Sequence, residues 1–363
     1  MQLAVNGSSA LAVLRAIRSG KCPVCDACPG TLARRDLTAP ALDEGAKWTR
    51  GRLDLSAFGV APASKQHPTH VAVPTAATRI RSPYARSTCY TRELPQGSFV
   101  DTGAGLLFSS PELLFIEMSK VMDPAALALL GYELCGTFSR DPVDPRVGDV
   151  TLDVEPVTSV ARIAAYLKAY GGKLSVPRAR AALSSIADNA WSPMEAVVAA
   201  LMSLPVTDCG YGLGPLVLNQ RISARTQEAG SRAPATRVPD ILVSGSTVGI
   251  NYDGHGLLDL DGLTELAAEG LLVLPVTSED LFSPGAVDAL MSVVCDLLEQ
   301  RDRRDVSQAR AAIASRVLRQ RRQLRVWSLL PWDDAESYAR ELVALERRAT
   351  ERERIGECEL RLM

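Results

Sequence analysis

The sequence predicts an α/β protein with a mixed β-sheet flanked by helices. Three observations in its C-terminal half carry this prediction. The apolar segments "PDILV" and "TVGINYD" flank Ser244, Gly245 and Ser246, a pattern typical of an antiparallel hairpin. The stretch "LDGLTELAAEG" has helical spacing and ends at Gly270, and the apolar strand "LLVLPV" follows it. A hairpin that continues through a crossover helix into a further strand gives a sheet with both antiparallel and parallel pairs.

Composition limits the class of protein before any motif is considered. The chain has 363 residues, of which 47% are hydrophobic, so it is long enough to bury a core and to form roughly two or three domains. A formal net charge of −2 excludes a bulk polycation, so nucleic-acid binding needs a local basic patch. No apolar run approaches the roughly 18 residues that span a bilayer, and no export signal is recognised at the start. We therefore expect a cytoplasmic protein with reduced cysteines and no membrane partner.

Residues 1–150 are predicted to form a small α/β domain. A short helix is expected in "NGSSALAVLRAIR", and strands are expected in "THVAVP" and "STCYTREL". Ser110 before Pro111 favours the start of a further helix, along which Leu113, Met118 and Val121 recur at helical spacing. Residues 151–190 then read as a helical connector, with helices in "VTSVARIAAYLKAYGG" and "VPRARAALSSIADNA".

Residues 191–300 contain the predicted mixed sheet. The helix "SPMEAVVAALMSL" precedes the hairpin, and the helix "PGAVDALMSVVCDLLEQ" follows the last strand. Residues 301–363 are basic, and two helices separated by "LLPWDD" are expected there.

Acidic side chains gather at one end of the predicted hairpin. With the turn at residues 244–246, pairing brings Asp240 opposite Ile250 or Asn251. Asn251 and Asp253 share a face because strand side chains alternate with period two, so Asp240 and Asp253 are expected to converge. Two adjacent carboxylates repel unless a proton or a cation lies between them, and oxygen ligands suit magnesium or manganese. In a phosphodiester-cleaving site such an ion polarises the phosphate and lowers the pKa of its bound water.

The order of these residues resembles the very-short-patch-repair-like branch of the PD-(D/E)XK nuclease superfamily. Glu195 in "SPMEAVV", "YGLGPLVLN", Asp240 in "VPDILV", "INYDG" and "LAAEGLLVLPVTSEDL" follow one another as in that branch, over roughly residues 191–300. The resemblance implies a restriction-endonuclease-like core in which Glu195, Asp240, Asn251 and Asp253 form the catalytic site. Asp240 and Asp253 would then be the metal ligands.

Two positions depart from that pattern. Asn251 stands where the branch has its metal-binding Glu, and Gly262 stands where it has Arg, although Asp259, Leu266 and Gly270 keep the spacing. An amide oxygen can ligate a metal but adds no charge, so magnesium binding is expected to be weak or absent. The upstream stretch "GAGLLFSSPELLFIEM" resembles AbiE-type abortive-infection antitoxins and regulators, where a strand pair precedes a helix that starts at a Ser-Pro pair.

Each acidic residue also has a structural explanation. Glu195 lies three residues after Ser192, which is the spacing of a capping box, and Asp240 after Pro239 suits the beginning of a strand. Asp253 before Gly254 suits a turn, and His255 suits a loop better than a general base.

A cysteine motif near the N-terminus offers a second candidate metal site. Cys22, Cys25 and Cys28 have C-x-x-C-x-x-C spacing, which is found in zinc and iron–sulfur sites. A fourth ligand would have to come from His67 or His70, so a loop of reduced thiols is the favoured interpretation.

Arginines dominate the region after residue 300. Arg316, Arg319, Arg321 and Arg322 are the candidate nucleic-acid-binding residues, because guanidinium groups bind phosphate oxygens well. A solvated helix face is the alternative interpretation of the same run.

These observations favour a nuclease-fold protein that binds nucleic acid, DNA rather than RNA, in a bacterial defence or toxin–antitoxin-like setting. Metal-dependent endonuclease activity would be weakened or lost in it. The alternative is a non-catalytic transcriptional regulator or antitoxin that uses the fold as a module for a partner protein. A third hypothesis is a structural protein without a site.

Overall fold

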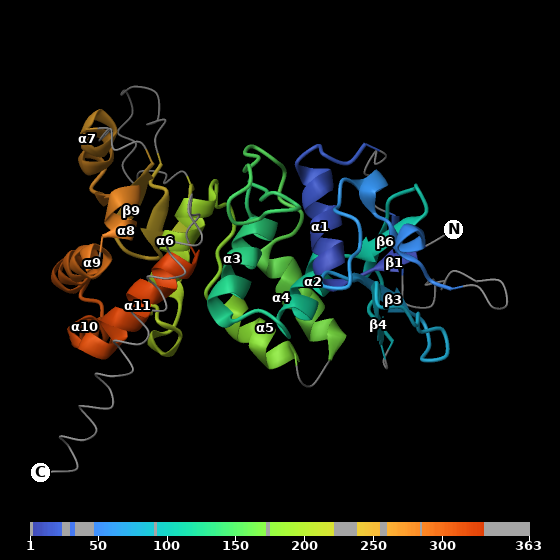
Figure 1. Cartoon of the computed structure of the whole chain (residues 1–363). Coiled ribbons are helices and arrows are strands. Elements are labelled where there is room, and N and C mark those ends of the chain that lie inside the picture. The colour runs from blue at the N-terminus through green and yellow to red at the C-terminus, as the bar shows by residue number, and fades with distance from the viewer. Residues whose placement is uncertain are drawn as a thin grey trace, which may run out of the picture. The chain divides into compact units, whose positions relative to one another are not determined.

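The computed structural model divides the chain into two compact units, Met1–Ser184 and Ser185–Met363, and each is described by itself (Figure 1). Cys25, Cys28 and His255 lie outside the described residues, as does the segment 330–363. The structure describes residues 3–23, 30–32, 47–90, 93–171, 175–220, 238–254, 260–283 and 285–329.

A six-stranded mixed sheet forms one layer of the first unit. Its order is β2-β5-β6-β1-β3-β4, with β1 parallel to β6 and β3 parallel to β4, while the other pairs are antiparallel. The strand expected in "THVAVP" is β3, whereas β4 overlaps the strand expected in "STCYTREL" only at residues 87–89 and begins two residues earlier. The strand bounds are β1 Leu3–Val5, β2 Gly30–Leu32, β3 Thr69–Val73, β4 Ala85–Cys89, β5 Phe99–Asp101 and β6 Leu106–Ser109.

Helix α2 lies at the centre of the helical part of this unit, in contact with α1, α3, α4 and α5. It starts at Pro111 because the Ser110 hydroxyl accepts a hydrogen bond from the backbone N–H of Leu113, as expected. It ends at Met118, so the helical spacing does not continue to Val121, which is 75% exposed. The helix bounds are α1 Gly7–Arg18, α2 Pro111–Met118, α3 Pro124–Cys135, α4 Val160–Tyr170 and α5 Ser175–Leu183, with short 3-10 helices at Arg50–Leu53 and Ser56–Phe58.

The two helices of the expected connector, α4 and α5, pack inside the first unit. Helix α4 contacts α2 and α5, and α5 contacts α2 and α3. Their amphipathic sequence pattern predicted the two helices. Their buried side chains, such as Ile163 and Leu167, lie against the rest of the unit.

A four-stranded mixed sheet organises the second unit. Its order is β10-β9-β8-β7, with β7, β8 and β9 antiparallel in turn and β10 parallel to β9. The predicted hairpin is present, and Gly245 takes the left-handed conformation (φ +72°) that its turn requires. The strand bounds are β7 Leu216–Leu218, β8 Ile241–Val243, β9 Val248–Asp253 and β10 Leu272–Thr277.

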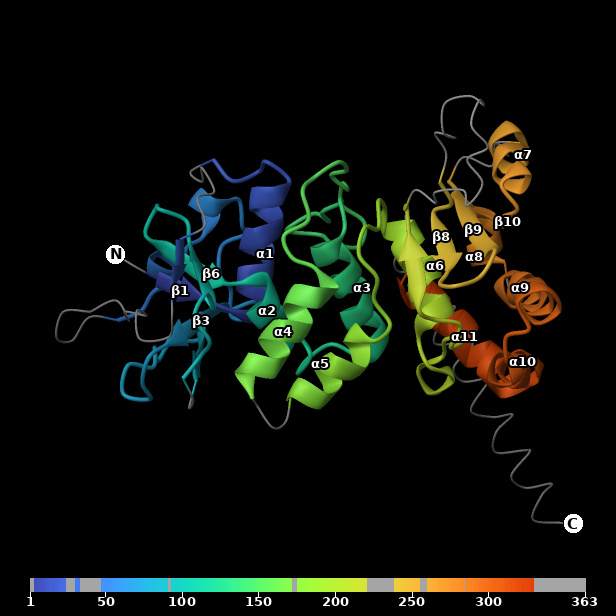
Figure 2. The same ribbon diagram turned by 180° about the vertical axis from the view of Figure 1, so that it is seen from behind.

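Helices flank this sheet, which confirms the predicted α/β class with a mixed sheet. Helices α6 and α9 contact β9, and α7 contacts β10, to which it connects through Gly270 (φ +84°) (Figure 2). Among the described residues, no helix has the length and apolar character needed to cross a membrane. The helix bounds are α6 Pro193–Ser203, α7 Leu260–Ala268, α8 Ser278–Phe282, α9 Ala286–Asp302, α10 Ser307–Ala314 and α11 Arg316–Leu329, with a 3-10 turn at Val206–Asp208.

The described part of the basic region contains two helices, α10 and α11, which are separated at Ser315. The break expected at "LLPWDD" and the helix expected after it lie outside the described residues, apart from Leu329. The Ser315 backbone is extended, and its hydroxyl accepts a hydrogen bond from the N–H of Leu318, so it ends one helix and caps the next.

The outer edge of β10 offers few hydrogen-bond donors. Leu272 donates its N–H to Thr247 on the β9 side, so by alternation residues 273, 275 and 277 point their backbone groups outward. Pro275 has no N–H, and the N–H of Thr277 donates to the Asp280 carboxylate at 2.8 Å. This edge of the sheet is therefore poor in outward N–H donors, among which Val273 remains.

Candidate functional site

Glu195 is held at the start of α6 by its own helix and by strand β7. The Ser192 hydroxyl accepts a hydrogen bond from the Glu195 N–H, which is the cap that the sequence predicts. The Glu195 carboxylate accepts from the backbone N–H of Trp191 at 3.0 Å, one residue before the position of a standard capping box. It also accepts from the side-chain amide of Asn219 at 2.9 Å. Helix start and strand end are thus tied together through one buried carboxylate.

Asn219, Asp240 and Asn251 lie at neighbouring positions across three strands. Leu218 pairs with Ile241, and Ile241 pairs with Ile250, which places Asp240 between Asn219 and Asn251. The predicted register, with Asp240 opposite Ile250 or Asn251, is therefore confirmed. The Asp240 N–H donates to the Asn251 amide oxygen at 2.9 Å, and the Asp240 carboxylate accepts from the Tyr252 N–H at 2.7 Å. Each side chain completes the other strand's hydrogen bonding where the hairpin ladder ends.

The electrostatics of Asp240 reflect its burial and its neighbour. Burial is the largest cause that raises the pKa of Asp240 to about 7, and the negative charge of Glu195 raises it further. The hydrogen bond from the Tyr252 N–H acts in the opposite direction. Burial also raises the pKa of Glu195, against the hydrogen bonds from Asn219, Trp191 and Ser192. The two carboxyl groups therefore lie close enough to interact, and a proton on one of them relieves the repulsion.

Asp253 lies at the far end of β9, where it pairs in register with Thr277 of β10. It is two residues beyond Asn251, past the end of β8. The neighbouring negative charge that raises the pKa of Asp240 comes from Glu195. The structure thus brings Glu195 and Asp240 together at one end of the sheet, with Asn251 beside them.

The described site offers few charged ligands for a magnesium or manganese ion. Within the described parts of the chain, which leave out residues 255–259, no group of three or more His, Cys, Asp or Glu side chains is close enough to hold a metal. The Asn251 amide oxygen, the neutral ligand that the sequence offers, accepts from the Asp240 N–H. Magnesium is commonly held by one or two carboxylates together with water, and here the Glu195 and Asp240 carboxylates each already accept hydrogen bonds from N–H donors.

The candidate nucleic-acid-binding arginines divide into two groups. Arg316, Arg319 and Arg321 are exposed on α11. Arg322 is 2% exposed and lies inside the second unit. Arg322 is therefore too buried to contact a phosphate on a bound nucleic acid, contrary to the expectation.

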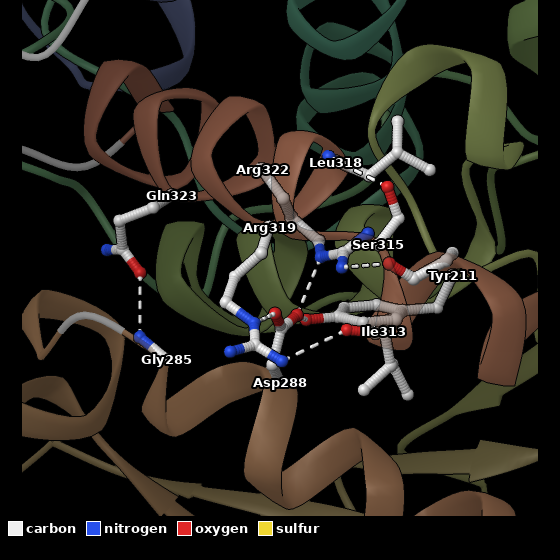
Figure 3. A network of polar contacts seen from close by, with 10 residues as sticks. Tyr211, Gly285, Asp288, Ile313, Ser315, Leu318, Arg319, Arg322 and Gln323 are labelled. Atoms are coloured by element: carbon white, nitrogen blue, oxygen red, sulfur yellow. Dashed lines mark hydrogen bonds and ion pairs between the residues drawn. The ribbon is translucent and has the colours of Figure 1, made fainter. Parts of the chain in front are cut away.

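A carboxylate on α9 holds Arg322 and Arg319 in place (Figure 3). Asp288 accepts from Arg322 Nε at 2.7 Å, from Arg319 Nε at 3.1 Å and from the Tyr211 hydroxyl at 2.6 Å. The Arg322 guanidinium lies over the Tyr211 ring, 4.4 Å from its centroid, and Arg322 also donates to the Ala312 carbonyl. This buried network connects α9, α10, α11 and the segment before β7.

Sequence reasoning missed two residues beside the carboxylate pair. Asn219 is 6% exposed, has a left-handed backbone (φ +50°), and its amide oxygen has no hydrogen-bond partner in the described structure. Trp191 is 45% exposed next to Glu195. An Asn directly after the apolar run "PLVL" was the one available signal, because Asn tolerates the left-handed region better than other residues with a side chain.

Comparisons of this chain with protein-family models, curated proteins and solved structures give no match. The nuclease-like and AbiE-like resemblances therefore stay predictions, and the functional argument rests on the geometry alone.

Proposed function

We propose that the chain is a nucleic-acid-binding protein whose second unit has a nuclease-type core without metal-dependent cleavage. A helix, three antiparallel strands, a crossover helix and a parallel strand follow one another in this unit. The resemblance places its motifs in the same order, with Glu195 on the helix, Asp240 at the second strand and "INYDG" on the third. This agreement supports the fold assignment and leaves the chemistry to the site residues.

One observation carries the proposal: the Asn251 amide oxygen accepts from the N–H of Asp240, beside the Glu195–Asp240 carboxylate pair. The position that a nuclease of this type fills with a charged ligand is neutral here and is used in strand pairing. The same surface therefore has one negative charge fewer with which to hold a magnesium ion at a phosphodiester.

Helix α11 supports duplex DNA as the first ligand to test. It contains five arginines and no acidic residue over Arg316–Leu329. Arg316 and Arg321 are exposed, so their guanidinium groups are accessible to phosphate oxygens. Each phosphate neutralised by such a group steepens the salt dependence of the binding constant by about 0.9 in logarithmic slope.

The test is a salt titration of DNA binding by fluorescence anisotropy, with single-stranded RNA as comparator. Replacing both Arg316 and Arg321 by Gln should flatten the slope by up to about 1.8 if both contact phosphate. Arg310→Gln is the matched control, because that guanidinium is paired with Asp296 and Glu299 at 2.8 and 2.5 Å. An unchanged slope in the double variant, or no binding by the parent chain at low salt, contradicts the proposal.

The neutral Asn251, engaged in strand pairing, favours a second candidate function, a regulator or antitoxin that uses the core to contact a partner protein. Replacement of Asn251 by Glu separates this candidate from a weakened nuclease. If the site is nuclease-derived, the variant should gain a magnesium- or manganese-dependent rise in melting temperature and cleave plasmid DNA slowly. If neither ion changes the melting temperature of the variant or of the parent, the result favours the protein-binding candidate.

A further inference from the structure

The first unit, which does not contain the candidate site, has a cavity of its own. Its volume is about 310 Å³, at the lower end of the roughly 300–1,000 Å³ that ligand pockets occupy. The second half of α1, strands β5 and β6, the start of α2 and residues 157–162 line it. Because helices and strands form most of the wall, the space is formed without a ligand.

The two carboxylates of the cavity wall have donors within the protein. Glu112 accepts from the Thr158 hydroxyl at 2.6 Å and is paired with Arg162 at 3.3 Å. Asp101 accepts from the N–H of Gly103 at 2.9 Å, within a turn. A cation in the cavity would have to compete with these contacts.

The second guanidinium group of the wall, that of Arg18, is also used by the fold. Its Nη1 donates to the Glu133 carbonyl at 2.8 Å, and its Nη2 donates to the carbonyls of Gly136 and Glu155 at 2.9 and 3.1 Å. Its Nε is fully buried, so it is closed to a molecule in the cavity. Two guanidinium groups thus balance two carboxylates in the described wall, which favours neither an anion nor a cation as ligand.

Apolar side chains supply most of the surface that a ligand would touch. Leu14 and Phe108 are buried in the wall, whereas Ile17, Val100 and Val157 line the cavity and are only partly buried. A molecule that covers this surface removes apolar area from water, which is favourable in proportion to the area covered. A charged molecule would lose its hydration against the same surface, which is costly without a new partner. The wall therefore favours a neutral, largely apolar ligand.

The volume limits the size of that ligand. An apolar cavity of about 150 Å³ stays dry and binds benzene. The cavity of the first unit is about twice as large, so it has room for two fused rings.

We propose that this cavity binds a neutral, largely apolar molecule of about two fused rings, which packs against Ile17, Val100 and Phe108. The apolar contacts supply the affinity, and the paired charges of the wall exclude ionised analogues. The inference is independent of the nucleic-acid binding proposed for the second unit.

The experiment measures binding of indole to the full chain by calorimetry at neutral pH. Indole-5-carboxylate and 5-(aminomethyl)indole are the anionic and cationic comparators, because each adds one small charged group to the same ring system. Indole should bind at least about tenfold more tightly than either comparator, which corresponds to about 1.4 kcal/mol.

Two variants place the binding in the cavity. Val100→Phe adds volume to the wall from β5, and Ile17→Phe adds it from α1, so each should weaken indole binding by at least about tenfold. Circular dichroism checks that each variant is folded, and the second variant carries the test if the first does not fold. Val143→Phe, at a position 65% exposed in the same unit, is the matched control and should leave the affinity unchanged.

Binding of either charged comparator as tight as that of indole would overturn the proposal. Indole affinity that is unchanged in a folded Val100→Phe or Ile17→Phe variant would place the binding elsewhere and overturn it too. Absence of indole binding at millimolar concentration would have the same consequence.

Discussion

Replacement of Asp288 by Ala should destabilise the second unit more than any surface charge change. The substitution removes the acceptor shared by Tyr211, Arg319 and Arg322. Arg322 is 2% exposed and cannot reach water, so its charge would remain buried without a counter-ion. Breaking a buried pair in this way costs about 3–5 kcal/mol. The half-exposed Arg319 adds less than about 1 kcal/mol, because solvent screens it.

This loss is a large fraction of the roughly 5–15 kcal/mol by which natural domains are stable. The assay is urea unfolding followed by tryptophan fluorescence, since Trp191, Trp327 and Trp332, three of the four tryptophans, belong to the second unit. Far-ultraviolet circular dichroism of the whole chain is recorded in parallel, because two units need not unfold in one transition.

Asp296→Ala is the matched control for this prediction. Asp296 lies on the same helix, α9, and its partner Arg310 is at the surface, so the loss should stay below about 1 kcal/mol. The double change Asp288→Leu with Arg322→Met should recover much of the lost stability, because it removes both buried charges together. If Asp288→Ala unfolds at the same urea concentration as Asp296→Ala, the argument from buried charge is refuted.

Three further outcomes are expected. The folded-state pKa of Asp240 is about 7, above its ordinary value of 3.8, so the folded chain retains a proton that the unfolded chain loses first. Stability should therefore fall as pH rises from about 4 to about 8, by up to about 4 kcal/mol from this group. In Asp240→Asn the melting temperature should no longer show this decrease with pH. If parent and variant show the same pH dependence of the melting temperature, the raised pKa does not belong to Asp240. Asp123→Ala should lose about 1 kcal/mol in urea unfolding, because Asp123 accepts from the N–H groups of Ala125 and Ala126 at the start of α3, whereas Asp123→Ser should retain most of it. Gly245→Ala should destabilise the hairpin by about 1 kcal/mol in the same assay, since its φ is +72°, and Gly249→Ala should be worse because its Cβ would lie 2.6 Å from the Ile241 carbonyl oxygen.

Local signals predicted the elements of this chain better than their packing. Ser110-Pro111 and Ser192-Pro193 marked two helix starts because a cap acts within one turn. The hairpin and its register followed from one turn and the alternation of side chains. The helices α4 and α5 were predicted from their hydrophobic periodicity, but an amphipathic stripe does not indicate which surface packs against it.

The candidate site was predicted in part for the same reason. Asp240 and Asn251 lie close in sequence across a hairpin, so their pairing could be worked out from the register. Arg322 was assigned to phosphate because its counter-ion, Asp288, is 34 residues away and its stacking partner, Tyr211, is further still. A run of arginines carries no information about such distant partners. The contact between Asn219 and Glu195 depends on a left-handed backbone that the sequence hardly specifies.

The scarcity of outward donors on β10 bears on how the protein behaves at high concentration. An apolar strand at the margin of a sheet is a common starting point for aggregation, because a strand from another molecule can pair with it. Leu272, Val273 and Leu274 are only half-buried, so the side chains alone would invite such contact. An approaching strand would meet no N–H at Pro275, and the N–H of Thr277 already donates to the Asp280 carboxylate, which leaves Val273 as the outward donor of β10. The β10 edge can therefore carry apolar side chains and still pair poorly with a strand from another molecule.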